Sequence, residues 1–437
     1  MTEEQKKKLE QKLWDIANTL RGKMNADEFR DYILGFIFYK YLSERLYLYA
    51  NSVLASDGID FAQIDENSDD GKAYLAAVSE AAIDELGFFL KPSELFRAVA
   101  KRGSKAGNFI IEDLARILNN IERSTMGTES EDDFDDLFSD MDLTSNKLGR
   151  TEEAKNTLIA KVLTHLDEID FELENADSDV LGDAYEYLIG QFASGAGKKA
   201  GEFYTPPEVS DLMARLADPQ EGDDICDPTC GSASLLMKCG RQIRNKTGTK
   251  RYALYGQESI GSTWALAKMN LFLHGEENHQ LEWGDTIRNP KLRTSEDHLR
   301  HFDVVVANPP FSLDKWGADD ADTDQYNRYW RGIPPKSKGD YAFITHMIEI
   351  AKRQSGRVAV IVPHGVLFRG GAEGKIRQQL IEENLLDAVV GLPANLFTTT
   401  GIPVAILIFD RSREAGGANA DRKDVLFIDA SKEFTPG

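Results

Sequence analysis

The chain has 437 residues, 41% hydrophobic and 28% charged, a balance typical of folded globular domains. It contains no run of about 18 apolar residues, which argues against a membrane-spanning helix, and its charged first 20 residues do not resemble a signal peptide. The net charge is −22, and residues 1–200 alone hold 23 basic and 40 acidic side chains. A protein this acidic does not bind nucleic acid over its whole surface, because phosphate contacts require Lys and Arg. Any action on DNA requires a local basic groove or a basic partner.

The first half of the chain is predicted to be helical. Leu9, Leu13, Ile16 and Leu20 recur at helical spacing, and Asn25 with Glu28 resembles a capping box ahead of another helix. Further helices are expected near residues 73–90, 108–122, 151–166 and 177–192. The acidic run 129–140 is interpreted as a solvated loop or a short capped turn, with docking of a partner as the alternative. A Gly-rich linker follows at 194–201.

The second half alternates short apolar strands with helices. Strands are expected at 223–227, 252–257, 281–284, 302–307, 356–362, 385–391, 403–409 and 424–429. Helices are expected at 231–243, 259–273, 340–353 and 372–384. Continuous runs such as DVVVA and RVAVIV are typical of strands buried on both faces. The sequence therefore predicts an α/β protein with a helical N-terminal domain, residues 1–170, followed by a doubly wound, mostly parallel sheet, residues 171–437.

Three motifs follow predicted strands, where such sheets bind ligands. The small-residue turn DPTCGSA (227–233) lets backbone N–H groups approach a ligand, although an ordinary turn explains it equally well. It is neither G-x-G-x-x-G nor a P-loop. Glu258 ends the next strand, where nucleotide sites bind ribose hydroxyls, and Asp285 in GDT (284–286) is placed to accept from an adenine amine. Helix or turn capping is the alternative for both acids.

The tetrapeptide Asn308-Pro309-Pro310-Phe311 follows the strand FDVVVA and is the most specific motif. Its two prolines stiffen the turn and remove N–H donors, so backbone carbonyls remain available as acceptors. Asn308 adds a neutral side-chain carbonyl. An amino group at this turn finds acceptors on one side and the Phe311 ring on the other.

The chain resembles the methyltransferase (modification) subunit of type I restriction–modification systems, which belongs to the amino-methylating, S-adenosylmethionine-dependent DNA methyltransferases. The resemblance covers nearly the whole chain. It rests on LGDAYEYLI (181–189), GEFYTP (201–206), DPTCGSA (227–233), GQE (256–258), GDT (284–286), NPPF (308–311), GDYAFI (339–344), RVAVIVPHGVLFRGG (357–371) and TGIPVAILIF (400–409).

The resemblance implies methyl transfer from S-adenosylmethionine to the N6 amino group of a flipped-out adenine in duplex DNA, without a metal. It also implies a separate specificity subunit that reads the DNA, a restriction subunit, and two copies of this chain per specificity subunit. Family members continue past a segment like FIDAS (427–431) into a helical tail, so we expect either a trimmed chain or a short member.

The resemblance also implies site residues. The implied catalytic residues are Asn308, Pro309, Pro310 and Phe311. Cofactor contacts are implied for Glu202, Phe203, Tyr204, Thr205, Pro206, Pro207, Asp227, Gly231, Ser232, Ala233, Ser234, Glu258, Asp285, Thr286 and Asn308. Without the family, GEFYTPP is typical of a helix start with Pro in the first turn. The family often has Gly at the position of Ala233, whose methyl group is expected to narrow the cofactor loop slightly.

Other functions remain open from the residues alone. A catalytically silent cofactor-binding scaffold, a protein-glutamine or RNA methyltransferase, and a nicotinamide dehydrogenase are the alternatives. Two clusters are interpreted either as DNA contacts or as local packing and solvated helix ends. They comprise Trp316, Tyr326, Arg328, Tyr329, Trp330 and Arg331, and Arg241, Arg244, Lys246, Lys250 and Arg251. The three cysteines, Cys226, Cys230 and Cys239, lack zinc-site spacing, so we expect reduced thiols in the cytoplasm.

Overall fold

The computed structural model describes residues 3–18, 26–105, 107–128, 130–171, 173, 180–195, 204–397 and 401–434. The chain forms two compact units, residues 1–196 with 268–274, and residues 197–267 with 275–437. This division groups the helix Val180–Gly195 with the first unit. The domain boundary near residue 170 stays a prediction.

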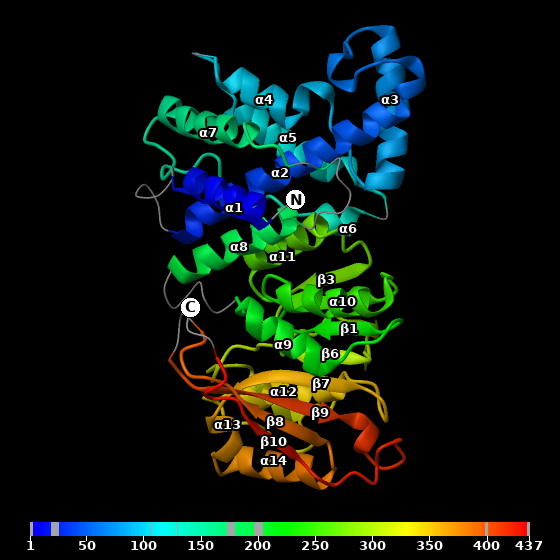
Figure 1. Ribbon diagram of the computed structural model, residues 1–437, viewed down its shortest axis with the longest axis vertical. Coiled ribbons are helices and arrows are strands. Elements are labelled where there is room, and N and C mark those ends of the chain that lie inside the picture. The colour runs from blue at the N-terminus through cyan, green and yellow to red at the C-terminus, as the bar shows by residue number, and fades with distance from the viewer. Residues whose placement is uncertain are drawn as a thin grey trace. The chain divides into compact units, whose positions relative to one another are not determined.

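The first unit is helical, as predicted (Figure 1). Its helices are α1 (Glu3–Ala17), α2 (Ala26–Val53), α3 (Asp69–Leu86), α4 (Phe96–Gly103), α5 (Ile111–Ser124), α6 (Glu131–Phe134), α7 (Glu152–Asp167) and α8 (Val180–Gly195). Local signals set several boundaries: α3 begins after Ser68, whose side chain accepts the Gly71 N–H, and ends at Gly87 in a left-handed conformation. The predicted capping box at Asn25 lies outside the described residues.

The acidic run 129–140 differs in part from its prediction. It contains the one-turn helix α6, which has no side-chain cap at Ser130, and most of its described acids are exposed. However, Phe134, Leu137 and Phe138 are buried, so the run is anchored in the core of this unit. Asp133 also pairs with the buried ammonium of Lys268 at 2.6 Å. The solvated-loop interpretation therefore missed three apolar anchors, because each is isolated among acids in the sequence.

The second unit is built on an eight-stranded sheet in the order β10-β8-β9-β7-β6-β1-β2-β3. All eight predicted strands are present: β1 (Asp224–Asp227), β2 (Ala253–Glu258), β3 (His279–Trp283), β6 (Val304–Ala307), β7 (Arg357–Pro363), β8 (Leu386–Gly391), β9 (Val404–Asp410) and β10 (Leu426–Asp429). Neighbouring strands are parallel, except that β9 is antiparallel to both β7 and β8. This confirms the predicted doubly wound, mostly parallel sheet.

Helices of the second unit cover the sheet. They are α9 (Pro207–Ala217), α10 (Ser234–Thr247), α11 (Gly261–Leu273), α12 (Asp340–Glu349), α13 (Gly365–Phe368) and α14 (Ala372–Glu382). Apolar residues of α12, α13 and α14 pack with one face of β6, β7, β8 and β9 in a single core cluster, while α9 contacts β6, β7 and β9, and α10 contacts β1, β2 and β6. The helix start at Pro207 agrees with the interpretation of GEFYTPP as a helix entry, whereas α13 and the hairpin of β4 (Arg293–Ser295) and β5 (His298–Leu299) were not predicted.

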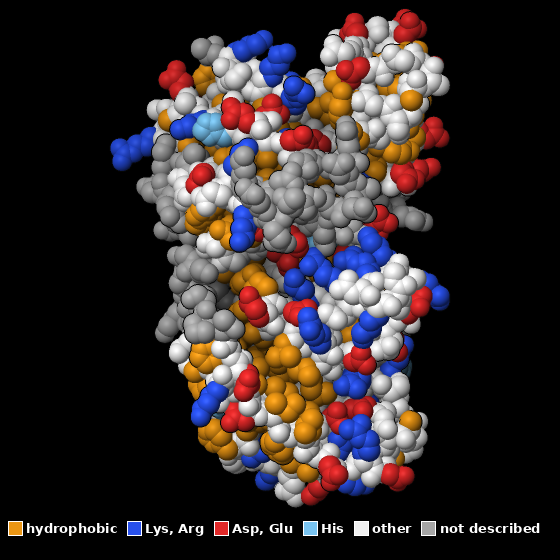
Figure 2. Space-filling view, viewed as in Figure 1, with side chains coloured by type: hydrophobic (Ala, Val, Ile, Leu, Met, Phe, Trp, Pro, Cys, Tyr) orange, Lys and Arg blue, Asp and Glu red, His pale blue; other side chains and the backbone are white. Residues whose placement is uncertain are grey.

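The edge strand β10 contrasts with the buried central strands. Its side chains Leu426, Phe427 and Ile428 are 58%, 73% and 41% exposed, whereas every residue of β9 is buried. Figure 2 shows apolar surface in the lower part of the view, where Figure 1 draws the C-terminal strands. Among the described residues, no helix combines the length and the apolar character needed to cross a bilayer.

The strand order reverses at the centre of the sheet, and this reversal positions the site. From β1 the chain proceeds to β2 and β3 on one side and later to β6 and β7 on the other. The helices that follow β1 and β6 therefore leave a crevice at the carboxyl ends of these strands, which is where open α/β sheets bind ligands.

Candidate functional site

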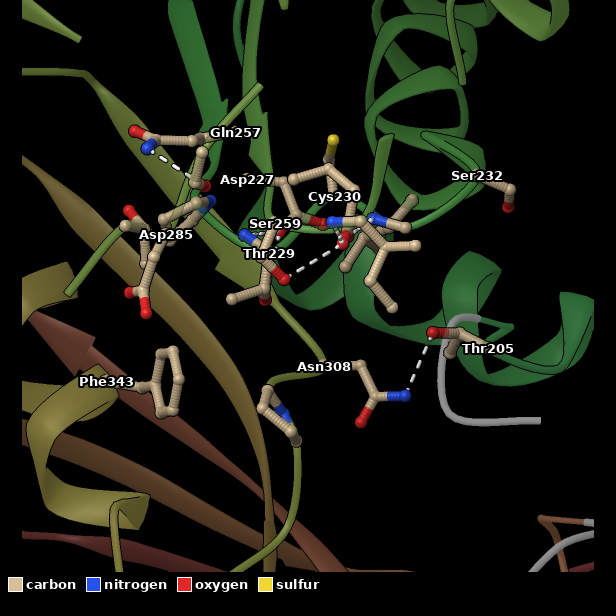
Figure 3. Close-up of a pocket in the computed structure, with 18 of the residues that line it drawn as sticks. Thr205, Asp227, Thr229, Cys230, Ser232, Gln257, Ser259, Asp285, Asn308 and Phe343 are labelled. Carbon is tan, nitrogen blue, oxygen red and sulfur yellow. Dashed lines mark hydrogen bonds between the residues drawn. The ribbon is translucent and has the colours of Figure 1, made fainter. Parts of the chain in front are cut away.

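A cavity of about 260 Å³ lies at the carboxyl ends of β1, β2, β3 and β6 (Figure 3). Its lining combines the turn after β1, the end of β2, the GDT segment after β3 and the turn after β6. The lining residues are Thr205, Asp227, Pro228, Thr229, Cys230, Gly231, Ser232, Ser234, Leu235, Gln257, Glu258, Ser259, Ile260, Gly284, Asp285, Thr286, Asn308, Pro310, Leu313 and Phe343.

The turn after β1 reaches the cavity through left-handed backbone. Gly231 has φ +55° and Ala233 has φ +62°, directly before α10 begins at Ser234. Glycine adopts this region freely, but an alanine pays a steric cost there. The Ala233 side chain is buried and does not line the cavity, so the expected narrowing by its methyl group is not observed. The backbone conformation explains why glycine suits this position.

Two buried carboxylates face the cavity. Asp227 is 2% exposed, and burial, reinforced by the nearby Glu258, raises its pKa from 3.8 to about 8, against the opposing hydrogen bond from the Thr229 N–H at 2.9 Å. Burial also raises the pKa of Glu258, although its carboxylate accepts backbone N–H groups. Among the described residues that line the cavity, none is basic. The cavity therefore favours a cationic ligand, which would compensate the carboxylates.

Glu258 is both a helix-capping residue and a candidate ligand for ribose hydroxyls, the two interpretations left open by the sequence. Its Oε1 accepts the Ile260 N–H at 2.9 Å, ahead of α11, which is a capping contact. Its Oε2 accepts the Gly231 N–H at 3.1 Å, which ties the end of β2 to the turn after β1. Oε1 also accepts from the Ser259 hydroxyl at 3.3 Å, so the acceptor capacity left for a ligand hydroxyl lies mainly on Oε2.

Asp285 is arranged in the same way. Its Oδ1 accepts the N–H groups of Ile287 and Arg288 at 2.8 and 3.1 Å, as the capping alternative predicted. Among the described residues, its Oδ2 has only a long ionic contact with Arg288 Nε, at 3.9 Å. The side chain lines the cavity on the same side as Phe343 (Figure 3).

The turn after β6 places Asn308 at the cavity wall. Asn308 Nδ2 donates to Thr205 Oγ1 at 3.1 Å, which orients the amide (Figure 3). Asn308 Oδ1 is buried and accepts no hydrogen bond from any described residue. A buried acceptor without a donor is costly, so it marks a position for a donor from a ligand. The neighbouring Phe311 ring meets the Phe397 ring edge to face, with centroids 5.8 Å apart.

The cavity brings together most of the predicted site residues. Those that line it are Thr205, Asp227, Gly231, Ser232, Ser234, Glu258, Asp285, Thr286, Asn308 and Pro310. Those described elsewhere are Tyr204, Pro206, Pro207, Ala233, Pro309 and Phe311. Glu202 and Phe203 lie outside the described residues.

Several lining residues were not predicted individually. Gln257 donates to the carbonyls of Gly284 and Asn289 at 3.1 and 2.9 Å, so it fixes the segment that carries Asp285. Ile260 and Phe343 supply apolar surface. Gln257 and Phe343 belong to motifs recognised in the sequence, GQE and GDYAFI, but no local pattern showed that their side chains reach the site. In the first unit, Asp183, Glu186 and His274 bring their ligand atoms within 4.8 Å, a cluster that was also not predicted.

The basic clusters serve mainly as packing and ion pairs. Arg328 is buried and pairs with Asp324 at 2.7 Å, and Arg331 pairs with Glu349 and Glu383 at 2.6 and 2.7 Å. Tyr329 and Trp316 are buried against each other. In the second cluster, acidic or carbonyl partners within 3.3 Å are present for Arg244, Lys246, Lys250 and Arg251. The alternatives of local packing and a solvated helix end account for these contacts.

Comparison with known proteins identifies the family. The family model described as "N-6 DNA Methylase" matches residues 176–436, and the "HsdM N-terminal domain" model matches residues 9–166. The type I restriction enzyme MpnII methylase subunit of Mycoplasma pneumoniae is 36% identical over 99% of this chain and 80% of its own length. The crystal structure of the type I restriction–modification system methyltransferase subunit from Streptococcus thermophilus is 37% identical, with a TM-score of 0.84 over 99% of this chain and 89% of that chain.

A third match is a solved structure described for complex assembly and conformational transition of the type I restriction–modification system. Its TM-score is 0.63 over 97% of this chain and 76% of that chain, but at 20% identity it shows the fold alone. The chain belongs to the N-6 DNA methylase family, as a type I restriction–modification methyltransferase subunit. The predicted family, fold and adenine-specific DNA methyltransferase class are confirmed.

Proposed function

We propose that the cavity binds S-adenosylmethionine and that the chain transfers the methyl group to N6 of an adenine flipped out of duplex DNA. The observation that carries this proposal is the buried Asn308 Oδ1, which lacks a donor from the described residues and lies at the cavity wall. The free acceptor on Asn308 can bind an amino group of a substrate. The adjoining cavity, which favours cations, can bind a positively charged methyl donor next to that amino group.

The cavity residues fit the proposed cofactor. Glu258 would hold the ribose hydroxyls with its remaining acceptor capacity, and Asp285 would accept from the adenine amine. Ile260 and Phe343 offer apolar surface to an adenine ring. Asp227 would balance the cationic end of the cofactor, whose charge offsets the cost of ionising a buried carboxyl group. When bound, S-adenosylmethionine supplies a methyl group already activated by its sulfonium charge.

The turn after β6 would activate the acceptor amine. The exocyclic nitrogen of adenine is a weak nucleophile because its lone pair is delocalised into the ring. Acceptance of its two N–H groups by Asn308 Oδ1 and the Pro309 carbonyl favours a pyramidal nitrogen. The same two dipoles stabilise the positive charge that develops on the nitrogen during attack. The Thr205 hydroxyl keeps the Asn308 carbonyl aimed by accepting from its amide nitrogen.

Phe311 would stack on the extruded base. A base inside a duplex is inaccessible, so it must leave the helix, at a cost of a few kcal/mol. Stacking on an aromatic ring returns about 1–3 kcal/mol. The edge-to-face contact with Phe397 fixes the orientation of the Phe311 ring before the base arrives.

DNA recognition would come from a separate specificity subunit. This chain carries a net charge of −22, and the basic residues near its motifs are engaged in the ion pairs described above. The match to a structure described for assembly of a type I system supports a multisubunit complex. We include a restriction subunit and two copies of this chain per specificity subunit in the proposal.

The test is Asn308→Ala in the chain reconstituted with its specificity subunit. Single-turnover methyl transfer to duplex DNA should fall about 10²–10³-fold, the usual cost of losing one preorganised electrostatic partner. Cofactor affinity should change far less. Asn278→Ala is the matched control. Asn278 lies directly before β3, at the amino end of that strand and away from the carboxyl ends that form the cavity, and it donates to the Tyr252 carbonyl.

Two outcomes would contradict the proposal. Wild-type transfer by Asn308→Ala would favour the silent-scaffold alternative for this site. Transfer to RNA or to a glutamine-containing peptide, but not to duplex DNA, would favour the protein or RNA methyltransferase alternative.

A further inference from the structure

Two recognised motifs, GDYAFI (339–344) and RVAVIVPHGVLFRGG (357–371), contain charged residues that have no role in the function proposed so far. The structure brings one charged residue from each of them together. Asp340, the first residue of α12, accepts from Arg369 Nη2 at 2.5 Å. Asp340 is 3% exposed, so this carboxylate is almost completely buried.

The second partner of Asp340 is Ser312, the residue directly after the catalytic turn. Ser312 donates its backbone N–H to Asp340 Oδ1 at 2.7 Å, and its hydroxyl lies 3.4 Å from Asp340 Oδ2. Ser312 has φ +52°, a left-handed conformation that costs a non-glycine residue energy unless its surroundings fix it. A second link, from the Gly339 N–H to the Leu313 carbonyl at 2.8 Å, holds the same loop against the start of α12.

Arg369 is itself fixed on the opposite side. Its guanidinium donates to both carboxylate oxygens of Glu373, at 2.7 and 2.9 Å, and Glu373 is 3% exposed. The Arg369 carbonyl accepts from Arg377 at 3.1 Å. A chain of partly buried, charge-assisted hydrogen bonds therefore runs from α14 through Arg369 and Asp340 to Ser312. Such bonds are the stronger kind and hold their partners in fixed geometry.

We propose that Asp340, oriented by Arg369, is a positioning residue that holds the Asn308–Phe311 turn in its working conformation. The Asp340 carboxylate fixes the left-handed residue that ends the turn, and the direction of the Asn308 and Pro309 acceptors follows from the path of that turn. A displacement of these acceptors by about 1 Å is enough to cost up to about 10²-fold in rate. This inference rests on the catalytic role proposed for the turn.

The primary test is Asp340→Asn in the reconstituted complex. One carboxylate oxygen becomes an amide NH2, which then faces either Arg369 or the Ser312 N–H, so one donor meets another donor. Single-turnover methyl transfer should fall about 10–100-fold, while the dissociation constant for S-adenosylmethionine stays within about threefold. The cofactor constant should hold because its proposed polar ligands Asp227, Glu258 and Asp285 lie at or just after the ends of β1, β2 and β3, and the hydrogen bonds of Asp340 go instead to Ser312 and Arg369.

Ser312→Gly separates positioning from general stability. Glycine adopts φ +52° without support, so adding Ser312→Gly to Asp340→Asn should recover part of the lost rate. Glu349→Gln is the matched control: it alters another carboxylate of α12, which pairs with the buried Arg331 and does not contact the turn. This control should lower the Tm but leave the transfer rate within about twofold.

Defined outcomes overturn the proposal. Wild-type transfer by folded Asp340→Asn refutes it, as does a loss that Glu349→Gln reproduces and Ser312→Gly does not relieve. If Asp340→Asn does not fold, Arg369→Lys takes its place, with the same split expected between rate and cofactor affinity. Asn308→Ala is measured in parallel: a slow Asn308→Ala with a normal Asp340→Asn rejects only the positioning role, whereas a normal Asn308→Ala rejects the proposed function itself.

Discussion

Replacing Asp227 with Asn removes an ionisable buried group from the cavity and changes little else. Asp227 Oδ1 accepts the Thr229 N–H at 2.9 Å, and the amide oxygen of asparagine can accept the same bond. Because burial raises the pKa of Asp227 to about 8, the empty cavity holds a mostly protonated acid at neutral pH. A cationic cofactor favours the ionised form, so its binding should release a proton.

The expected size of this coupling follows from that pKa. A group with a pKa of about 8 is ionised to roughly 3% at pH 6.5 and to about half at pH 8. If the cofactor binds only beside the ionised carboxylate, its affinity should rise about fifteen-fold over this interval and level off above it. Above pH 8, Asp227→Asn should bind S-adenosylmethionine more weakly than the wild type does. Its affinity should also no longer rise between pH 6.5 and pH 8.

Stability gives an independent check with a defined sign. The pKa of Asp227 is higher in the folded chain than its ordinary 3.8, so the folded state retains a proton that the unfolded state releases. The free energy of unfolding should therefore fall as pH rises from about 4 to about 8, by roughly 5 kcal/mol in total from this group. Asp227→Asn lacks this loss, so its Tm should exceed that of the wild type at pH 8.

The assay is titration calorimetry of S-adenosylmethionine, without DNA, in two buffers of different ionisation enthalpy. The cofactor's own amino group also titrates near pH 8, and the difference between wild type and Asp227→Asn cancels its contribution. At pH 7 that difference should be close to one proton released per cofactor bound. Equal proton release by the two proteins, or a wild-type affinity independent of pH, would refute the reasoning.

Three further predictions concern the turn, the ribose acid and DNA. Ala233→Gly should raise the free energy of unfolding by about 0.5–1 kcal/mol. The strain relieved in the folded chain is larger than the free-energy cost of the extra conformational freedom that glycine gives the unfolded chain; an unchanged or lower Tm would contradict this. Glu258→Gln should weaken S-adenosylmethionine binding by about 1.5–3 kcal/mol in calorimetry and also lower the Tm, since an NH2 group replaces an acceptor of the Gly231 or Ile260 N–H. The isolated chain should bind duplex DNA weakly and without sequence preference in gel shifts, and only the specificity subunit should produce tight, salt-sensitive binding.

The strands of the catalytic sheet were predictable because burial on both faces leaves a continuous apolar run. RVAVIV and DVVVA are such runs: the first forms most of β7, and the second contains all of β6. The hairpin β4–β5 has strands of only three and two residues, too short to show any periodicity. Its pairing depends on where the chain passes between β3 and β6, which local sequence does not encode.

Site residues at the ends of strands could be predicted from the sequence, whereas site residues contributed by neighbouring helices could not. Asp227, Glu258 and Asn308 lie at or just after strand ends, so parallel pairing alone brings them to one edge of the sheet. Phe343 comes from the middle of α12, and only the packing of that helix on the sheet directs it into the cavity. Sequence distance also hid the roles of Arg331, since Glu383, one of its buried partners, is 52 residues away.

The hydrogen bond from the Gly231 N–H to Glu258 has a consequence for selectivity among adenosine compounds. Dinucleotide-binding folds use amide groups of the turn after the first strand to hold a pyrophosphate. Here one of these amides is occupied internally by a carboxylate, and Asp227 stands at the base of the same turn. ATP and the nicotinamide dinucleotides share adenine and ribose with S-adenosylmethionine but carry anionic tails. The tail, rather than the adenosine, therefore decides which of these compounds the cavity admits, and phosphorylated nucleotides should be poor competitors.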